Sequence, residues 1–130
     1  MAGAIGSAAA QGMAGKMIAY DDLEWAPMAE GSPVMAVTLW GDETTGPYGA
    51  LLKLPPGTEV PLHAHTGDYS GINLQGTWRH YFDDGEDLEL PPGSYVFQPG
   101  KALHGDVCIG DQECILFVRQ DVGRDYIPKE

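Results

Sequence analysis

The chain has 130 residues, enough for one domain with a single buried core. It carries 19 acidic and 7 basic side chains, so its formal net charge at pH 7 is −12, which argues against binding to nucleic acid or to an anionic membrane surface. The 18 glycines and 10 prolines favour many short strands separated by turns over long helices.

The first fifteen residues are almost all small, and their apolar run is short and interrupted by glycine. No basic residues precede the run, so the segment has the features of neither a complete signal peptide nor a membrane span. We expect residues 1–15 to be a flexible N-terminal segment, residues 16–130 to form a single domain, and the protein to be cytoplasmic. The alternative is export, because Ala8-Ala9-Ala10 resembles the cleavage site of a signal sequence that starts upstream.

Strand-forming runs separated by turn residues follow in chain order. After a mixed segment at 18–27, which suits an edge strand or a short helical turn, the predicted strands are 34–40, 48–54, 60–65, 69–75, 77–82, 88–90, 94–98, 104–109 and 113–119. The last two runs are expected to form a hairpin, and the tail to Glu130 is expected to be irregular. Many short strands without helical periodicity predict an all-β sandwich or barrel.

The two cysteines, Cys108 and Cys114, lie on either side of the turn in this expected hairpin. They could face each other and form a disulfide, but there is no CxxC pair of the kind found in zinc fingers. Cysteine is also among the most frequently buried residue types when it is not oxidised. We therefore expect two free, partly buried thiols.

Three of the four histidines form the most informative pattern in the chain. His63 and His65 are two apart in a predicted strand, so their side chains project from the same face, and His104 begins a later strand. Two imidazoles on one face and a third from a neighbouring strand make a site for a metal ion. The weaker interpretation is three buried histidines that hydrogen-bond within the protein.

These histidines lie in two segments that match a known family. Residues 57–76 resemble the first cupin motif, Gly-x5-His-x-His-x3–4-Glu-x6-Gly, and residues 93–104 resemble the second, Gly-x5-Pro-x-Gly-x2-His-x3-Asn. Two linked motifs in this order are more specific than either one alone. The resemblance implies an all-β double-stranded β-helix, the jelly-roll barrel of the small single-domain RmlC-like cupins, and within these it points to an uncharacterised group.

Three positions depart from the cupin motifs. Tyr69 stands where the first motif has its glutamate ligand, and the adjacent Asp68 would face the other side of the strand unless a bulge intervenes. Lys101 and Cys108 stand where the second motif has glycine and asparagine. The sequence around His104, together with the missing glutamate, is similar to acetylacetone dioxygenase, a cupin that holds iron with three histidines.

Three neutral imidazoles leave coordination positions open for water, O₂ or a substrate, as in catalytic metal sites. Imidazole suits several divalent ions; the resemblance favours Fe(II), with Zn, Mn and Ni as alternatives. The first hypothesis is a non-haem Fe(II) dioxygenase that uses O₂ to cleave a small enolizable or diketone-like substrate. The second is a Zn-, Mn- or Ni-dependent cupin hydrolase, isomerase or lyase. The third is a non-catalytic cupin that binds a metal or a small ligand.

Tyr69 and Gln98 are the candidate catalytic residues besides the metal ligands. Tyr69 could bind the metal or donate a proton, but a neutral phenol is a poor ligand, so we favour a place in the pocket wall. Gln98 could hydrogen-bond a bound molecule, or simply end its strand. We expect His80 to be packed or exposed rather than part of the pocket, and Asp68 to be a solvated turn residue.

Two further expectations concern the core and the surface. Aromatic side chains are expected in the core rather than in a substrate site, namely Trp40, Trp78, Tyr95 and Phe97. Arg79 and Arg119 are expected to form surface ion pairs. Sheet edges usually need a cover, and the resemblance implies a homodimer, with 18–25 as the candidate pairing segment.

Overall fold

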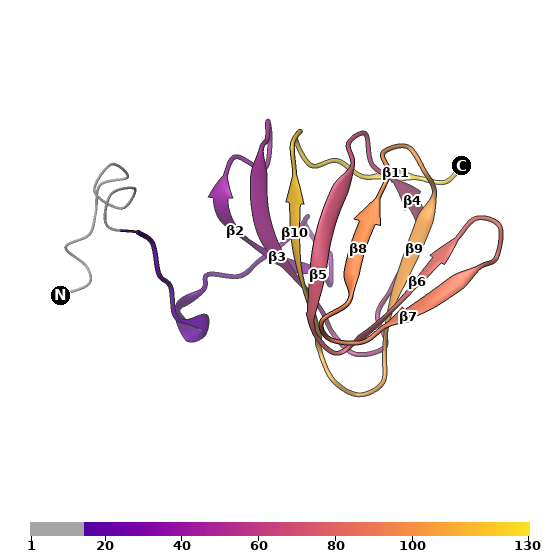
Figure 1. Cartoon of the computed structure of the whole chain (residues 1–130), viewed down its shortest axis with the longest axis horizontal. Helices are drawn as coiled ribbons and strands as arrows, with labels where there is room; N and C mark the ends of the chain where they lie inside the picture. The colour runs from indigo at the N-terminus through magenta and orange to yellow at the C-terminus, as the bar shows by residue number, and fades with distance from the viewer. Residues whose placement is uncertain (1–14) are drawn as a thin grey trace.

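The computed structural model describes residues 15–130, so the predicted flexible segment lies, except for Gly15, outside the described residues. Two antiparallel sheets curve around a common interior, and Figure 1 shows the strands of one sheet side by side from β2 to β8. Within the described part of the chain the only helix is a single 3₁₀ turn, η2 (Tyr20–Asp22). No helix there is long and apolar enough to cross a membrane.

From β3 onward the chain passes repeatedly between the two sheets, and only β6 and β7 are consecutive strands of one sheet. The six-stranded sheet contains, in spatial order, β1 (Ala26–Pro27), β2 (Met35–Gly41), β3 (Tyr48–Leu54), β10 (Cys114–Gln120), β5 (Tyr69–Gln75) and β8 (Tyr95–Gln98). The five-stranded sheet contains β11 (Ile127–Pro128), β4 (Glu59–Ala64), β9 (His104–Ile109), β6 (Thr77–Phe82) and β7 (Asp87–Leu90). The predicted double-stranded β-helix is therefore confirmed, and the nine predicted strands between 34 and 119 are present with small shifts at their ends.

Two elements differ from the sequence prediction. The expected last hairpin is absent, because β9 pairs with β4 and β6 whereas β10 pairs with β3 and β5 in the other sheet. The tail is not wholly irregular, since β11 pairs with β4. Period-two patterns identify strands but do not say which strands share a sheet, so a crossing between sheets looks like a hairpin in the sequence.

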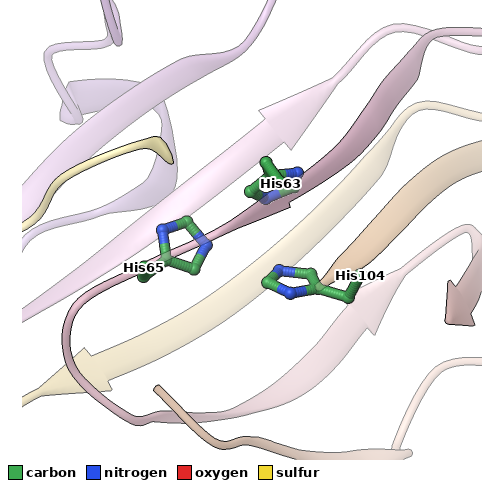
Figure 2. Close-up of side chains that lie close together, drawn as sticks. All are labelled: His63, His65 and His104. Carbon is green, nitrogen blue, oxygen red and sulfur yellow. The ribbon is translucent and has the colours of Figure 1, made fainter. Parts of the chain in front are cut away.

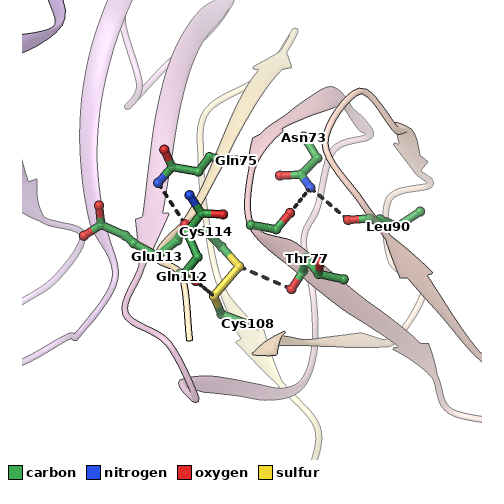
Figure 3. The surroundings of a disulfide bond; sticks show 9 residues. Asn73, Gln75, Thr77, Leu90, Cys108, Gln112, Glu113 and Cys114 are labelled. Carbon is green, nitrogen blue, oxygen red and sulfur yellow. Dashed lines mark hydrogen bonds between the residues drawn. A yellow bond between two sulfur atoms is a disulfide. The ribbon is translucent and has the colours of Figure 1, made fainter. Parts of the chain in front are cut away.

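A disulfide joins the strands at this crossing. Cys108 near the end of β9 and Cys114 at the start of β10 are bonded, with their Cα atoms 5.8 Å apart and both side chains completely buried (Figure 3). The prediction of two free thiols is therefore wrong. Both cysteines point into the space between the sheets, where the chain passes from one sheet to the other, so their sulfur atoms meet in the core.

The core lies between the sheets and contains only one of the four aromatic residues predicted there. Trp78 is buried, but Trp40, Tyr95 and Phe97 are 42%, 64% and 54% exposed. Tyr95 and Phe97 belong to β8, an edge strand whose alternate residues Val96 and Gln98 face inward instead. Because the outer face of this sheet carries large apolar side chains, residue type alone did not reveal which face was buried.

Candidate metal centre

The three histidines of the sequence pattern come together at one end of the barrel. His63 lies in β4, His65 directly follows the end of that strand, and His104 is the first residue of β9, opposite His63 in the antiparallel pair. One ring nitrogen from each histidine lies within 4.8 Å of the other two. Figure 2 shows the three rings around one common space.

Each ring is held by a hydrogen bond from its Nδ1 to a main-chain oxygen: His63 to Pro61 at 2.7 Å, His65 to Asp125 at 2.7 Å and His104 to Ala102 at 3.1 Å. A carbonyl oxygen only accepts, so Nδ1 carries the proton in all three rings. The lone pair is then on Nε2, the atom left for a metal. Metal-binding histidines in proteins are typically oriented in this way.

Burial keeps the two deepest rings uncharged. His63 and His104 are 3% and 0% exposed, and burial lowers the pKa of His63 and lowers the pKa of His104 to about 4. The Nε2 of His104 is buried and has no hydrogen-bond partner among the described residues. An unpaired buried nitrogen costs free energy, and coordination of a cation removes that cost. The residues present therefore fit a divalent metal ion.

No carboxylate belongs to the cluster within residues 15–130. Asp68 is exposed and accepts a hydrogen bond from the Gly100 N–H at 2.7 Å, so it is the solvated turn residue expected from the sequence. The Tyr69 ring lies 5.7 Å from that of His65 and 6.0 Å from that of His104. Burial raises the pKa of Tyr69 well above its usual value, so the side chain beside the cluster is a neutral phenol.

A cavity of about 420 Å³ adjoins the histidines between the two sheets. His63, His65 and Tyr69 form part of its wall near the cluster, together with Asp106. Most of the remaining wall is apolar and includes Met28, Val34, Leu52, Leu54, Val60, Trp78, Leu116 and Val118. This volume is in the range of small-molecule sites, and such sites combine apolar walls with a few polar groups.

Polar side chains cross the inner face of the six-stranded sheet in one row, and three of them, Tyr48, Tyr69 and Gln120, line the cavity. Gln120 is paired with Tyr48 on one side and with Tyr69 on the other, and Tyr69 is paired with Gln98. The Tyr48 hydroxyl donates to the Gln120 Oε1 at 2.8 Å. Tyr69 thus belongs to this polar row and forms part of the cavity wall.

Gln98 ends a hydrogen-bonded chain that passes beside the cluster. His80 contacts the Asp106 carboxylate through Nδ1 at 2.6 Å and the Gln98 Oε1 through Nε2 at 2.7 Å, and its ring stacks on that of His104 at 5.1 Å. Burial alone would lower the pKa of His80, but the hydrogen bond and charge of Asp106 outweigh it and raise that pKa. His80 is therefore a packed histidine, as predicted.

Three residues near the histidines were not identified from the sequence. The position of Asp106 was predictable, because it lies two positions after His104 in one strand and so faces the same side of the sheet as His104. The positions of Asp125 and Tyr126 were not predictable, since they belong to a tail without strand periodicity. The Tyr126 ring stacks on His63 at 4.8 Å.

The remaining predicted polar residues lie away from the cluster. Arg79 pairs with Asp87 at 2.8 Å and Arg119 with Asp121 at 2.7 Å, so the prediction of surface ion pairs is confirmed.

Comparisons with known proteins agree with this architecture. Among solved structures, the polyketide cyclase RemF from Streptomyces resistomycificus is 21% identical with a TM-score of 0.72, covering 88% of this chain and 85% of its own. An RmlC-like cupin from Ralstonia eutropha JMP134 is 29% identical with a TM-score of 0.68, and the match covers 85% of this chain and 71% of that cupin. The DMSP lyase DddQ from Ruegeria pomeroyi DSS-3 is 18% identical with a TM-score of 0.64, and the match covers 86% of this chain and 58% of the lyase.

At 21% and 18% identity the likeness to the cyclase and the lyase concerns the fold alone. No curated protein matches the chain. The family of ChrR cupin-like domains matches residues 13–122, which is most of the sequence. The chain belongs to this family and therefore to the cupins.

Proposed function

We propose that this cupin is a metal-dependent enzyme in which the Nε2 atoms of His63, His65 and His104 hold a divalent ion. The observation that carries the proposal is the hydrogen bonding of the rings, because each Nδ1 is tied to a carbonyl and each Nε2 is left for a ligand. Three protein ligands leave coordination positions for a substrate, as in catalytic rather than structural sites.

We further propose Fe(II) as the ion and dioxygen-dependent cleavage of an enolizable, diketone-like substrate as the reaction. The three histidine ligands are neutral, and the negative charge of Asp106 is balanced by His80. The bound ion would therefore keep its positive charge, which an enolate anion of the substrate compensates. When bound, Fe(II) would supply the redox chemistry with O₂. For a β-diketone the balance is R–CO–CH₂–CO–R′ + O₂ → R–COOH + R′–CO–CHO. One C–C bond breaks, both oxygen atoms remain in the products, and no external reductant is needed.

The chain's own residues bind and orient this substrate. The apolar walls accept an apolar substrate body and exclude water, and the neutral Tyr69 phenol donates a hydrogen bond to a substrate oxygen near the histidines. Gln98 does not belong to the cavity wall; it is proposed as a positioning residue, because its carbonyl oxygen holds the His80 ring against that of His104.

The proposal is tested by metal content and by O₂ consumption. Protein purified without oxygen and loaded with Fe(II) is expected to consume one O₂ per molecule of a cleaved diketone or enolizable acid. His63→Ala and His104→Ala are expected to lose bound metal while their circular dichroism stays that of a β protein, and Leu88→Ala, an exposed change in β7, is the control. Unchanged metal content in both histidine variants would show that the ligand set is wrong. Native zinc with no O₂ uptake after Fe(II) loading would exclude the oxygenase.

A second candidate function is supported by the Asp106–His80–Gln98 chain. A hydrogen-bonded histidine and carboxylate beside a metal site suit proton transfer, which favours a Zn-, Mn- or Ni-dependent hydrolase, isomerase or lyase. The structural relatives whose names give a cyclase and a lyase are consistent with such chemistry on this fold. Turnover without oxygen by protein loaded with one of these ions would favour this candidate. Metal binding without turnover under either condition would favour the non-catalytic alternative.

We also propose that residues 16–130 act as one domain and that the protein is a homodimer. Exposed apolar side chains on the outer face of the six-stranded sheet support the dimer. Disulfides persist in oxidising compartments, so the Cys108–Cys114 bond supports the exported alternative over the cytoplasmic location.

A further inference from the structure

We propose that the C-terminal strap, defined as residues 121–129, positions the metal ligands, with Asp125 orienting His65 and Tyr126 orienting His63. The inference deepens the proposed function and rests on metal binding by the three histidines. The family match ends at residue 122, so most of the strap lies beyond the part of the chain that this family describes. Figure 1 shows the chain after β10 running across one end of the barrel to reach β4.

Asp125 ties the strap to the loop that follows His65. Its main-chain oxygen accepts the hydrogen bond from the His65 Nδ1 at 2.7 Å. Its two carboxylate oxygens accept from the Thr66 N–H at 2.9 Å and from the Thr66 hydroxyl at 2.5 Å. Because the side chain fixes Asp125 to the residue next to His65, the carbonyl oxygen that orients the imidazole is fixed as well.

The strap also extends along the strand that carries His63. Tyr126 stacks on the His63 ring with a centroid distance of 4.8 Å and an interplanar angle of 26°. The next residues pair with β4, Pro128 lying opposite His63, and the Lys129 N–H donates to the Leu62 oxygen at 3.1 Å. Two of the three ligand rings therefore contact the strap, whereas the Nδ1 of His104 is held by the loop before its own strand.

The beginning of the strap is anchored on the loop between β2 and β3, two strands of the six-stranded sheet. The Arg124 N–H donates to the Glu43 oxygen at 2.8 Å, and its guanidinium lies 3.1 Å from the Glu43 carboxylate. A Cβ on Gly123 would lie 2.2 Å from the Thr44 oxygen, so the backbones pack closely there. With both ends fixed, the segment between them cannot shift without breaking these contacts, and its residues Asp125 and Tyr126 form part of the cavity wall.

The physical consequence is preorganisation of the ligands. Residues that fix the orientation of a ligand ring raise metal affinity, and their loss typically lowers it about 10- to 100-fold. We therefore expect the strap to set the metal affinity and the coordination geometry, even though none of its residues is among the three proposed ligands.

The experiment measures Co(II) affinity and the visible absorption of bound Co(II) in the full chain, by competition with a chelator. Asp125→Ala removes both hydrogen bonds from Thr66 together with a charge, whereas Thr66→Val removes only the bond from the hydroxyl and leaves the charge unchanged. Both are expected to lower Co(II) affinity by about tenfold or more and to alter the absorption bands. Asp121→Ala removes an exposed charge at the start of the strap and is expected to leave the affinity within about twofold.

Tyr126 has a conservative variant that separates ring stacking from folding. Tyr126→Ala is expected to lower Co(II) affinity, whereas Tyr126→Phe keeps the ring and is expected to retain wild-type affinity and absorption. Wild-type affinity in Asp125→Ala, Thr66→Val and Tyr126→Ala would overturn the role of the strap while leaving the metal site intact. A wild-type protein that binds neither Co(II), Zn(II) nor Fe(II) would instead overturn the proposed function, and the strap's role with it.

Discussion

At the scale of single residues, the chemistry of the site depends on hydrogen bonds that select one tautomer of each imidazole. The acceptors come from three different places, namely the β4 backbone, the C-terminal strap and the loop before β9. Each acceptor is a main-chain oxygen, which carries no net charge and cannot itself be protonated. The ligand set therefore stays neutral, and the polar groups around it determine which substrate charge is favoured.

Replacing Tyr69 with phenylalanine tests its proposed role as a hydrogen-bond donor. Loss of one donor to a developing charge typically lowers kcat by about 10²-fold, while metal content and KM are expected to change little. Steady-state kinetics with the substrate identified by O₂ uptake gives the result. Tyr95→Phe, on the outer face of β8, is the control. A kcat in Tyr69→Phe equal to that of the wild type would mean that the phenol only forms part of the wall.

The buried imidazole of His104 makes the stability of the metal-free protein depend on pH. Its pKa is about 4 in the folded protein and 6.5 in the unfolded chain, so between these values the unfolded chain holds a proton that the folded protein does not. The contribution of His104 to stability is therefore full above about pH 6.5 and falls as the pH is lowered towards 4. The difference, 6.5 − 4 = 2.5 units, corresponds to at most about 3 kcal/mol.

Thermal unfolding of chelator-treated protein between pH 7 and pH 4.5 measures this effect. His104→Gln does not titrate in this range and is expected to lose less stability on acidification than the wild type. His80 acts in a separate window, because its raised pKa stabilises the folded state below pH 6.5 and this contribution is lost as the pH rises through the folded-state value. Identical acid sensitivity in the wild type and His104→Gln would contradict the prediction.

At the scale of elements, the turn between β5 and β6 carries the chain from one sheet to the other through a crowded point. Gly76 has φ +75°, and a Cβ there would lie 2.8 Å from both the Cys114 Sγ and the Glu113 oxygen. Gly85, in the β6–β7 turn, has φ +90° but no atom within 4 Å of such a Cβ. An alanine at either position would be strained by the positive φ, but only at position 76 would its Cβ also collide with neighbouring atoms.

Gly85→Ala is expected to cost about 1 kcal/mol of unfolding free energy from the left-handed backbone alone. Gly76→Ala is expected to cost a further 1–3 kcal/mol, roughly, because the neighbouring backbone has to move. Urea unfolding of both variants gives the difference. Equal losses would show that crowding at the sheet crossing is relieved without cost.

The disulfide between β9 and β10 is expected to stabilise the crossing between the sheets. Closing a loop of this length lowers the chain entropy of the unfolded state, which raises the free energy of unfolding by about 2 kcal/mol. Reductant is therefore expected to lower the Tm of the wild type and to leave a Cys108→Ala/Cys114→Ala variant unchanged. Alkylation of both cysteines in the unreduced, unfolded protein would show that the bond does not form.

At the scale of the whole molecule, large apolar side chains are exposed on the outer face of the six-stranded sheet, where the proposed metal site gives them no role. β5 and β8 expose Ile72, Leu74, Tyr95 and Phe97 there, between 37% and 64% of each side chain. Ile72 lies opposite Tyr95 in the strand pair, so these residues form one patch. The 18–25 segment places Tyr20 and Trp25 near Lys53 of the same sheet, and its role in pairing two chains stays a prediction.

Sedimentation is expected to show a homodimer that this patch holds together. Leu74→Glu and Phe97→Lys are expected to shift the protein towards the monomer, because a charge in the interface would be desolvated. Leu88→Lys alters a leucine of comparable exposure in the other sheet and is the control. A wild-type monomer, or dimers unaffected by both patch variants, would contradict the homodimer.

The sequence by itself determined the strands, the jelly-roll class and the three histidines, because strand periodicity and the spacing within a motif are local properties. His63 and His65 share a face for that reason, and Asp106 could have been added by the same parity. The tertiary structure alone decided what depends on contacts between distant segments. These are the pairing of β9 and β10 with different sheets, the disulfide at that crossing, and the outward direction of Tyr95 and Phe97. The same holds for the strap, where a tail without any pattern supplies Asp125 and Tyr126 to the site.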